Sequence, residues 1–360
     1  MSYTTIDDPS EYFHIQLYTG TGSSHSVTND ANAGDFKPDW VWIKERSSAG
    51  GNKTYDSSRG VQEALQTQST AGEATTAQGL TAFNTDGFTV GSDGGHNQSS
   101  ATYVAWQWKA NGGTTSSNSD GDLTSTVQFN STAKFSIILY TGKDPIEPLD
   151  IGHGMGEAPD VYIVKNRDRG ANWGMYHKEL TSPAENRNLK LNSSAAEAAE
   201  STFWRNEAPT STIIKTGENA SVNVANENFV VYAWKEVQGF SKFGKYIGNG
   251  ASDAAPATNG PFIYTGFSPA WVMIKKISAV DDWLIFDNER DGFDPRVYRL
   301  FANDASGETT GTNNTIQFTS NGFKIRFHGG SMNTSGGEYI YMAFANSPFA
   351  TSKGIPTTGR

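Results

Sequence analysis

Short apolar stretches alternate with long polar ones along this chain, and three of the apolar stretches are nearly the same. Each begins with a proline, continues with aromatic and aliphatic residues, and ends on a lysine: Pro38 to Lys44, Pro159 to Lys165 and Pro269 to Lys275. Apolar residues fall on both faces of each run, which is typical of a strand that is covered on two sides. Proline cannot donate to a sheet ladder and therefore belongs at a strand start. We expect three equivalent strands, each in the interior of a sheet.

Two further signals recur at fixed spacing and confirm that the chain is a repeat. A polar residue that follows an aromatic one stands twelve positions after each lysine, at Asp56, His177 and Asp287. A later asparagine precedes a closing aromatic strand in each copy, at Asn97, Asn223 and Asn333. The distance between copies is the size of a small domain, which is too long for a solenoid unit. We therefore expect three related units in one chain.

The polar segments set the boundaries of these units. Residues 111–126 are almost entirely Ser, Thr, Gly, Asn and Asp, as in a linker, whereas the second unit runs into the third with hardly a break. Repeats two and three should therefore pack as a pair. The predicted organisation is an N-terminal arm (1–11), repeat one (12–110), a polar linker (111–134), repeat two (135–238), repeat three (239–348) and a tail (349–360).

Composition indicates an all-β fold. Turn-forming residues are abundant, and the hydrophobic share of 36% relies on 9 Trp, 14 Tyr and 20 Phe, which bury much area each. We predict three tandem antiparallel β-sandwich repeats, jelly-roll or lectin-like, each with its own core and at most a short helix. Helices are expected at Val61 to Leu65 and, behind a capping box at Ser194, over 195–200.

Charge and cysteine content exclude several classes of partner and of chemistry. The formal charge is −10 without a basic run, which disfavours a nucleic-acid or anionic-membrane partner. Cysteine is absent, so disulfides and thiolate chemistry are excluded. No apolar run is long enough to span a membrane, and the start of the sequence lacks a signal-peptide pattern, so we expect folding in a cytoplasm without membrane insertion.

Residues that could carry chemistry are few, and none is assigned a catalytic or metal-binding role. Asp56 with Arg59, and Asp287 with Arg290, could form a site or a structural ion pair. The structural interpretation is favoured because repeat two has His177 and Leu180 instead. The six histidines have no metal-ligand spacing, and we expect no cofactor; they are His14, His25, His96, His153, His177 and His328.

Two other groups are weighed in the same way. Asn118, Asp120 and Asp122 alternate as in a calcium loop but lack the closing glutamate, so a solvated turn is favoured. Trp173, Trp204 and Trp283 could be an exposed platform for sugar rings, but core positions are favoured. Any ligand should then bind at the loops that differ between copies, which are Thr21 to Asp35, Thr67 to Gln78, Asn186 to Asn206 and Asn303 to Asn314.

Longer motifs resemble a known family. Gly152 to Asp160 followed by Ile163 to Arg167, the opening strands Phe135 to Gly142 and Phe243 to Gly250, and Asn321 to Arg326 with Tyr339 to Phe344 are similar to a repeat domain of structural proteins of tailed, especially marine, bacteriophages. Repeat one lacks the Gly-His-Gly turn at His153.

The resemblance implies a function in the virion. It implies an accessory structural protein, either a tail fibre or appendage or a capsid decoration, that is assembled in the host cytoplasm and mediates attachment or particle stabilisation. The implied partners are other virion proteins, further copies of the chain and a host cell-surface glycan. The alternatives are a glycan-degrading, tailspike-like enzyme and a free lectin-like carbohydrate-binding module.

Overall fold

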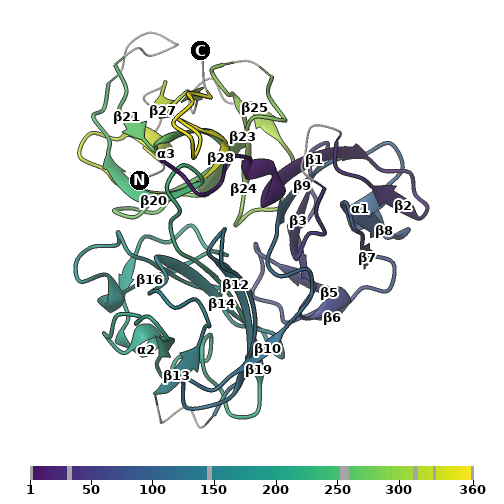
Figure 1. Ribbon diagram of the computed structural model, residues 1–360, viewed down its shortest axis with the longest axis vertical. Coiled ribbons are helices and arrows are strands. Elements are labelled where there is room, and N and C mark those ends of the chain that lie inside the picture. Colours follow the sequence, from purple (N-terminus) through teal and green to yellow (C-terminus); the bar gives the residue numbers. More distant parts are fainter. Residues whose placement is uncertain are drawn as a thin grey trace.

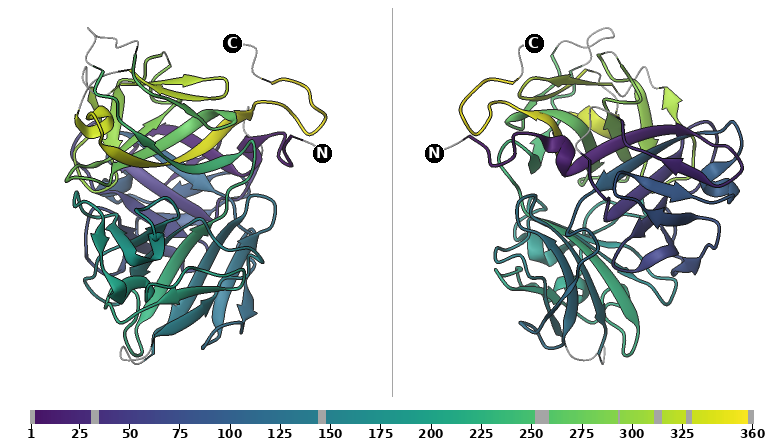
Figure 2. Two further views of the ribbon diagram at one scale, coloured as in Figure 1. Left: turned by 90° about the vertical axis from the view of Figure 1, so that its left-hand side faces the viewer. Right: turned by 45° about the vertical axis from the view of Figure 1, so that its right-hand side comes forward.

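The computed structural model describes residues 3–30, 35–143, 148–251, 259–292, 294–310, 315–326 and 330–357. These residues form an all-β protein with several antiparallel sheets. Figure 1 shows the three repeats as three lobes around a common centre, with repeat one in purple and blue, repeat two in teal and repeat three in green and yellow. Figure 2 shows the same arrangement from two further sides.

Three large sheets have the same strand order. The first contains, in spatial order, β1 (Phe13–Thr19), β9 (Thr102–Trp108), β3 (Trp40–Glu45), β4 (Lys53–Asp56), β5 (Gly60–Gln66) and β6 (Ala74–Thr75). The second contains β12 (Phe135–Thr141), β19 (Asn228–Trp234), β14 (Val161–Asn166), β15 (Gly174–His177), β16 (Arg187–Lys190) and β17 (Ala198–Ala199). The third contains β20 (Ser241–Ile247), β28 (Glu338–Pro348), β22 (Phe267–Lys276), β23 (Trp283–Asp287), β24 (Tyr298–Phe301) and β25 (Thr309–Thr310). The signature strands β3, β14 and β22 are internal in all three, as predicted.

A small sheet accompanies each large one. The small sheets are β2 (His25–Val27), β8 (Phe88–Val90) and β7 (Leu80–Phe83) in repeat one, β13 (Leu149–Gly152) and β18 (Ile213–Thr216) in repeat two, and β21 (Phe262–Tyr264), β27 (Gly322–Ile325) and β26 (Ile316–Thr319) in repeat three. The turn at Asn321-Gly322 joins β26 to β27, with Thr319 opposite Gly322. Asparagine followed by glycine predicts a hairpin, and the structure confirms the hairpin at this turn.

Helical segments among the described residues are short: η1 (Pro9–Glu11), α1 (Gly94–Asn97), η2 (Ala184–Asn186), α2 (Ser201–Trp204) and α3 (Gly330–Asn333). The helix predicted at Val61 to Leu65 is wrong, because these residues pair with β4 as strand β5. The helix predicted over 195–200 is also wrong. Ala198 and Ala199 form β17, and the carbonyl of Ser194 accepts hydrogen bonds from repeat three. Tertiary hydrogen bonds here outweigh the local helix propensity.

The segment predicted as a polar linker is partly a strand pair. β10 (Ser116–Asn118) and β11 (Ser125–Asn130) extend the second large sheet beyond β12, with Thr126 opposite Leu139. The amide of Gln128 is buried, and its oxygen accepts hydrogen bonds from the N–H groups of Asn111 (3.1 Å) and Gly113 (2.7 Å). The linker prediction fails because the edge of β12 supplies backbone partners that a polar sequence can use as well as an apolar one.

The expectation that each repeat buries its own core is correct only in part. Repeats one and three each have an apolar cluster of their own. One apolar cluster contains residues of all three repeats, among them Trp40 and Trp108, Phe135 and Trp234, and Trp271 and Phe344. In repeat one the signature strand divides its two faces, because Trp40 and Trp42 belong to this central cluster while Val41 and Ile43 pack toward the small sheet. The sequence predicted that this strand is apolar on both faces. One face packs against the neighbouring repeats, and the other packs against the small sheet.

The opening strand of each repeat ends in the same hydrogen-bonded turn, which we call the Tyr–Asn turn. A tyrosine hydroxyl donates to a main-chain carbonyl near the asparagine that recurs in each repeat. The pairs of hydroxyl and carbonyl are Tyr18 and His96, Tyr140 and Val222, and Tyr246 and Met332. The asparagine oxygen then accepts an N–H from the start of the next loop, in the pairs Asn97 and Thr21, Asn223 and Lys143, and Asn333 and Asn249. The repeated tyrosine and asparagine therefore have a structural role.

The Tyr–Asn turn also requires a glycine two residues after each tyrosine. A Cβ at Gly20 would lie 2.1 Å from the carbonyl oxygen of Gln98, and at Gly142 or Gly248 it would lie 2.3 Å from Val224 or Thr334. Gly20→Ala should therefore lower the free energy of unfolding by about 1–3 kcal/mol through overpacking. Gly94→Ala is the control, since its Cβ would meet nothing within 4 Å. Urea denaturation measures the free energy of unfolding of both variants. Equal stability of the two would contradict the need for glycine in the Tyr–Asn turn.

Candidate functional site

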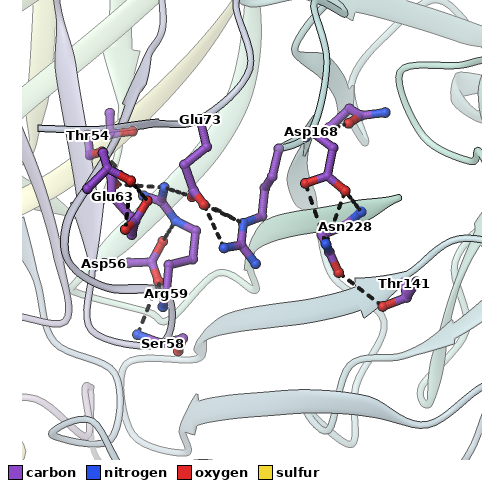
Figure 3. A network of polar contacts seen from close by, with 12 residues as sticks. Thr54, Asp56, Ser58, Arg59, Glu63, Glu73, Thr141, Asp168 and Asn228 are labelled. Atoms are coloured by element: carbon purple, nitrogen blue, oxygen red, sulfur yellow. Dashed lines mark hydrogen bonds and ion pairs between the residues drawn. The ribbon is translucent and has the colours of Figure 1, made fainter. Parts of the chain in front are cut away.

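The Asp56–Arg59 pair lies at the interface between repeats one and two (Figure 3). Arg59 is fully buried, and its Nε donates to the Asp56 carboxylate while its Nη1 lies 2.5 Å from Glu73. Repeat two contributes two groups. The Tyr232 hydroxyl donates to Asp56 (2.7 Å), and Arg167 donates to the other side of Glu73 (2.6 Å). The ion pair is thus part of a chain of charges that crosses from one repeat to the next.

The corresponding charges of repeat three meet repeat one in the same way. Arg290 lies 2.6 Å from Asp287 and 3.1 Å from Glu308. Repeat one supplies Arg46, which donates to Glu308 (3.0 Å), and Trp106, whose Nε1 donates to Asp287 (3.1 Å). Each carboxylate therefore has an arginine from its own repeat or its neighbour, and the structural interpretation of the pair is confirmed.

Repeat two meets repeat three without this charge cluster. His177 occupies the position of the aspartates, Leu180 that of the arginines, and Ile277 that of Arg46 and Arg167. The His177 ring is buried between the carbonyl of Tyr341, 3.2 Å from Nε2, and the N–H of Glu179, 3.1 Å from Nδ1. Because Nδ1 accepts and Nε2 donates, the ring is held in its neutral form.

Ionisation in these clusters follows from burial and from the partners. Burial alone would lower the pKa of Arg59, but Asp56, Tyr232 and Glu73 raise it above its ordinary value. Burial would likewise raise the pKa of Glu73, and the two arginines lower it instead. Burial lowers the pKa of His177 to about 3. The charged side chains of these interface clusters are therefore paired with one another, and none of them is available as a general acid or base.

The three signature lysines are buried at the same interfaces. Each Nζ donates to the carbonyl of the following residue and to a carbonyl of a neighbouring repeat: Lys44 to Ala305, Lys165 to Thr70 and Lys275 to Ser194. Burial lowers the pKa of each to about 8. A lysine of lowered pKa can be a nucleophile, but these side chains are enclosed by protein, and their nitrogens bind carbonyls. They join the repeats.

The direction of these contacts is cyclic. Repeat one reaches into repeat three, repeat three into repeat two, and repeat two into repeat one. Backbone hydrogen bonds cross the same three interfaces in the opposite direction, from Glu73 N to Arg167 O (2.6 Å), Glu308 N to Arg46 O (2.7 Å) and Glu197 N to Ile277 O (3.1 Å). The three repeats thus form a closed ring of three similar interfaces.

This ring corrects the prediction about the variable loops. Three of the four loops expected to bind a ligand hold the interfaces together, through Glu73 in Thr67 to Gln78, Glu197 in Asn186 to Asn206, and Glu308 in Asn303 to Asn314. Residues 311–314 of the last loop and 31–34 of the first, Thr21 to Asp35, lie outside the described residues. The loops differ between copies because each is fitted to a different neighbour.

A buried Asp–His–Tyr chain in repeat one was not predicted. Asp93 Oδ1 lies 2.6 Å from His96 Nδ1, and the Tyr55 hydroxyl lies 2.7 Å from His96 Nε2. Burial lowers the pKa of His96 despite its aspartate partner. Tyr55 and His96 are both fully buried, so the chain presents no reactive group to a substrate. It holds α1 against β4.

The remaining candidates lie apart from these interfaces. Trp173, Trp204 and Trp283 are buried, which confirms them as core residues. Asn118 donates to Asp120 (2.8 Å), and Asp122 accepts the N–H of Asp150 (2.8 Å), as in a turn. The part of the chain that the structure describes contains no group of three or more His, Asp or Glu side chains that could hold a metal ion. The predicted residue His328 lies outside that part.

A polar cavity of about 680 Å³ opens in repeat three. We call it the repeat-three pocket and define it by five of its lining residues, Asn288, Asp294, Arg296, Gln317 and Asn346. It lies between the ends of β23 and β28 and the small-sheet strand β26. Sequence reasoning missed it, although one signal was present, because Ala270 replaces the aspartate that follows the signature proline in repeats one and two.

These features define an all-β protein whose antiparallel sheets surround a common apolar centre. The chain belongs to a family described as a domain of unknown function, DUF7483, whose model matches residues 8–348. Neither a curated protein nor a solved structure matches the chain. Within the described ranges, none of the helices has the length and apolar character needed to cross a membrane.

The buried His177 gives a test by pH. The unfolded chain binds a proton at this ring below pH 6.5, whereas the folded ring stays neutral to about 3. The unfolded state therefore binds more protons, and stability falls as the pH is lowered through that window. His177→Gln should remove about 2–3 kcal/mol of the stability loss between pH 6.5 and roughly 4. Denaturation curves at both pH values measure this difference, and an unchanged loss would mean that the ring is protonated in the fold.

Proposed function

We propose that this protein is an accessory structural component of a bacteriophage virion, either a tail fibre or appendage or a capsid-decoration protein. In this proposal the three repeats are antiparallel β-sandwiches of jelly-roll or lectin-like type, and they act as one rigid body. The observation that carries the proposal is the closed ring of interfaces. In this ring the buried arginine, carboxylate and lysine side chains bind one another or main-chain carbonyls and so hold the repeats together. Such a design favours a scaffold or adaptor over an enzyme.

The shape of the ring supports a place in a symmetric assembly. The chain forms three lobes around one centre (Figure 1). Symmetric particles offer threefold-related neighbours to such a body. The proposed partners are therefore other virion proteins, with further copies of this chain as a second possibility and a host cell-surface glycan as the target of attachment. The motifs that resemble phage structural repeats support the same class.

The test is to locate the chain in particles. Density-purified particles from lysed host cells are analysed by mass spectrometry, and the position of the chain is then found by electron cryomicroscopy. We expect the chain at stoichiometric amounts on the tail or on the capsid surface. Its presence in the lysate together with its absence from purified particles would overturn the proposal.

A lectin-like function is the second candidate, and the repeat-three pocket is the observation that favours it. The pocket is lined by one carboxylate, Asp294. Glycoside cleavage ordinarily requires two carboxylates on either side of the bond, so we propose binding rather than hydrolysis at this place. An assay for new reducing ends on host-envelope polysaccharide distinguishes the two, and sustained turnover abolished by one acidic substitution would establish an enzyme.

A further inference from the structure

The repeat-three pocket lies at a position where repeats one and two each have an anchoring aspartate. In repeat one, Asp39 follows the signature proline and accepts hydrogen bonds from the N–H groups of Ala110 (2.7 Å) and Gly112 (2.8 Å) and from the Ser57 hydroxyl (2.6 Å). Lys37 donates to the carbonyl of Gly112 (3.0 Å). The chain that leaves repeat one is thereby folded over this place and closes it.

Repeat two bridges the corresponding place with ion pairs, and their side chains line a cavity of about 440 Å³. Asp160 accepts the N–H of Glu236 (2.9 Å) and the ammonium of Lys235 (2.9 Å). Lys178 lies 2.9 Å from the Glu236 carboxylate. In both repeats the aspartate anchors the segment that leads into the next unit.

Repeat three has lost this anchor. Ala270 stands in place of the aspartate, and Asn288 and Asn346 stand at the positions of Ser57 and Ala110. The Asn288 amide donates to the Asn346 oxygen (3.3 Å), but the buried Oδ1 atom of Asn288 has no partner. The pocket is thus a local departure from the pattern of the ring, and its polar lining is not needed to join two repeats.

The opposite wall carries a second unsatisfied group. The Arg296 side chain is only 12% exposed, and it lies over the Phe318 ring with its guanidinium carbon 5.4 Å from the ring centre. Its Nε is 3.3 Å from Asp294 Oδ1 in an ion pair, yet neither Nε nor Nη1 makes a hydrogen bond. Asp294 also accepts the N–H of Phe318 (3.2 Å). Buried polar groups without partners are costly, so a ligand that supplies those partners would gain affinity.

We propose that the repeat-three pocket binds a neutral sugar unit of a glycan. A sugar carries several hydroxyl groups, each a donor and an acceptor, so one unit can offer an acceptor to the guanidinium of Arg296 and a donor to the amide oxygen of Asn288. Further amide and hydroxyl groups line the cavity, and its volume is within the range of about 300–1,000 Å³ of small-molecule sites. Asp294 offsets the charge of Arg296, and the described residues that line the pocket include no other charged side chain, which favours neutral over acidic sugars. The inference rests on the lectin-like function proposed above, whose ligand class it names, and does not depend on the virion function.

The test uses the purified full chain and saturation-transfer NMR. The probes are D-glucose, D-galactose, D-mannose, N-acetyl-D-glucosamine and D-glucuronate, each added alone at millimolar concentration. We expect transfer to at least one neutral sugar and none to glucuronate. Asn288→Ala should weaken that binding about tenfold, as loss of one good hydrogen bond does. Ser320→Trp, which places a large ring at a turn lining the pocket, should abolish it.

Two comparisons keep the test decisive. Gln98→Ala removes an exposed amide in repeat one and should leave binding unchanged. Circular dichroism and thermal unfolding of each variant show that the fold is intact. Absence of transfer to every neutral sugar, preference for glucuronate, or binding that persists in both pocket variants would overturn the proposal. Because the assay contains no virus particles, its outcome is separate from that of the virion experiment.

Discussion

Arg59→Ala should lower the free energy of unfolding by about 3–5 kcal/mol, the cost of leaving a buried charge without its partner. The substitution removes one cation and leaves two carboxylates, Asp56 and Glu73, together with the Tyr232 hydroxyl, at an interface closed to water. Arg167 compensates in part, because it still binds Glu73. Among the described residues, Arg59 is the only cation that forms an ion pair with Asp56. The variant should therefore weaken the contact between repeats one and two as well as repeat one itself.

Arg169→Ala provides the matched control. Arg169 also pairs with a glutamate, Glu227, but its side chain is 48% exposed, and an exposed ion pair contributes about 1 kcal/mol or less. Guanidinium denaturation measured by tryptophan fluorescence compares the two variants. Equal losses would show that the buried position of Arg59 adds nothing.

Trp40→Ala should cost about 3–5 kcal/mol, the usual loss on truncating a buried aromatic side chain. Trp40 is 2% exposed and lies between two repeats, with its ring 4.4 Å from Tyr232 and 5.5 Å from Trp234 of repeat two and 4.5 Å from Trp108 of repeat one. The cavity should therefore open in the shared centre. We expect a single calorimetric transition at a lower temperature, because all three repeats contribute to the central apolar cluster that contains Trp40.

Val280→Ala is the control for that substitution, since Val280 is 71% exposed and should change stability by no more than about 0.5 kcal/mol. Scanning calorimetry of the wild type and both variants measures the transitions. If Trp40→Ala separated an early transition of repeat one from an unchanged transition of the other two, the repeats would be independent and the shared core would be refuted.

Elements that recur at fixed spacing could be predicted from the sequence. The signature strands, the closing strands and the hairpin at Asn321-Gly322 were located because each combines an apolar pattern with a punctuating Pro, Gly or Asn. The structural interpretation of Asp56 with Arg59 was also accessible, because the repeat containing His177 and Leu180 keeps the fold without the pair. Comparison between copies supplied what a single strand pattern could not.

The partners of those elements could not be predicted. An apolar pattern shows that Trp40 is buried but not that it packs against Tyr232, which is far along the chain. The loop containing Glu73 looked free because its contacts are long-range hydrogen bonds to Arg167, and such contacts leave no local periodicity. The alanine run after Ser194 and the polar segment around Gln128 failed for the same reason, since backbone groups of a neighbouring strand decided their conformation.

One junction of the ring has no peptide bond across it. Repeats one and two, and repeats two and three, follow each other in the chain, whereas repeats three and one meet only through side chains and hydrogen bonds. Asp7 accepts hydrogen bonds from Ser352, and Figure 2 shows the two chain ends on the same side of the molecule. The order in which the repeats are synthesised is therefore not fixed by the architecture. We expect a circular permutant that joins the segments around Asp7 and Ser352, with a new start between repeats one and two, to retain every interface of the ring.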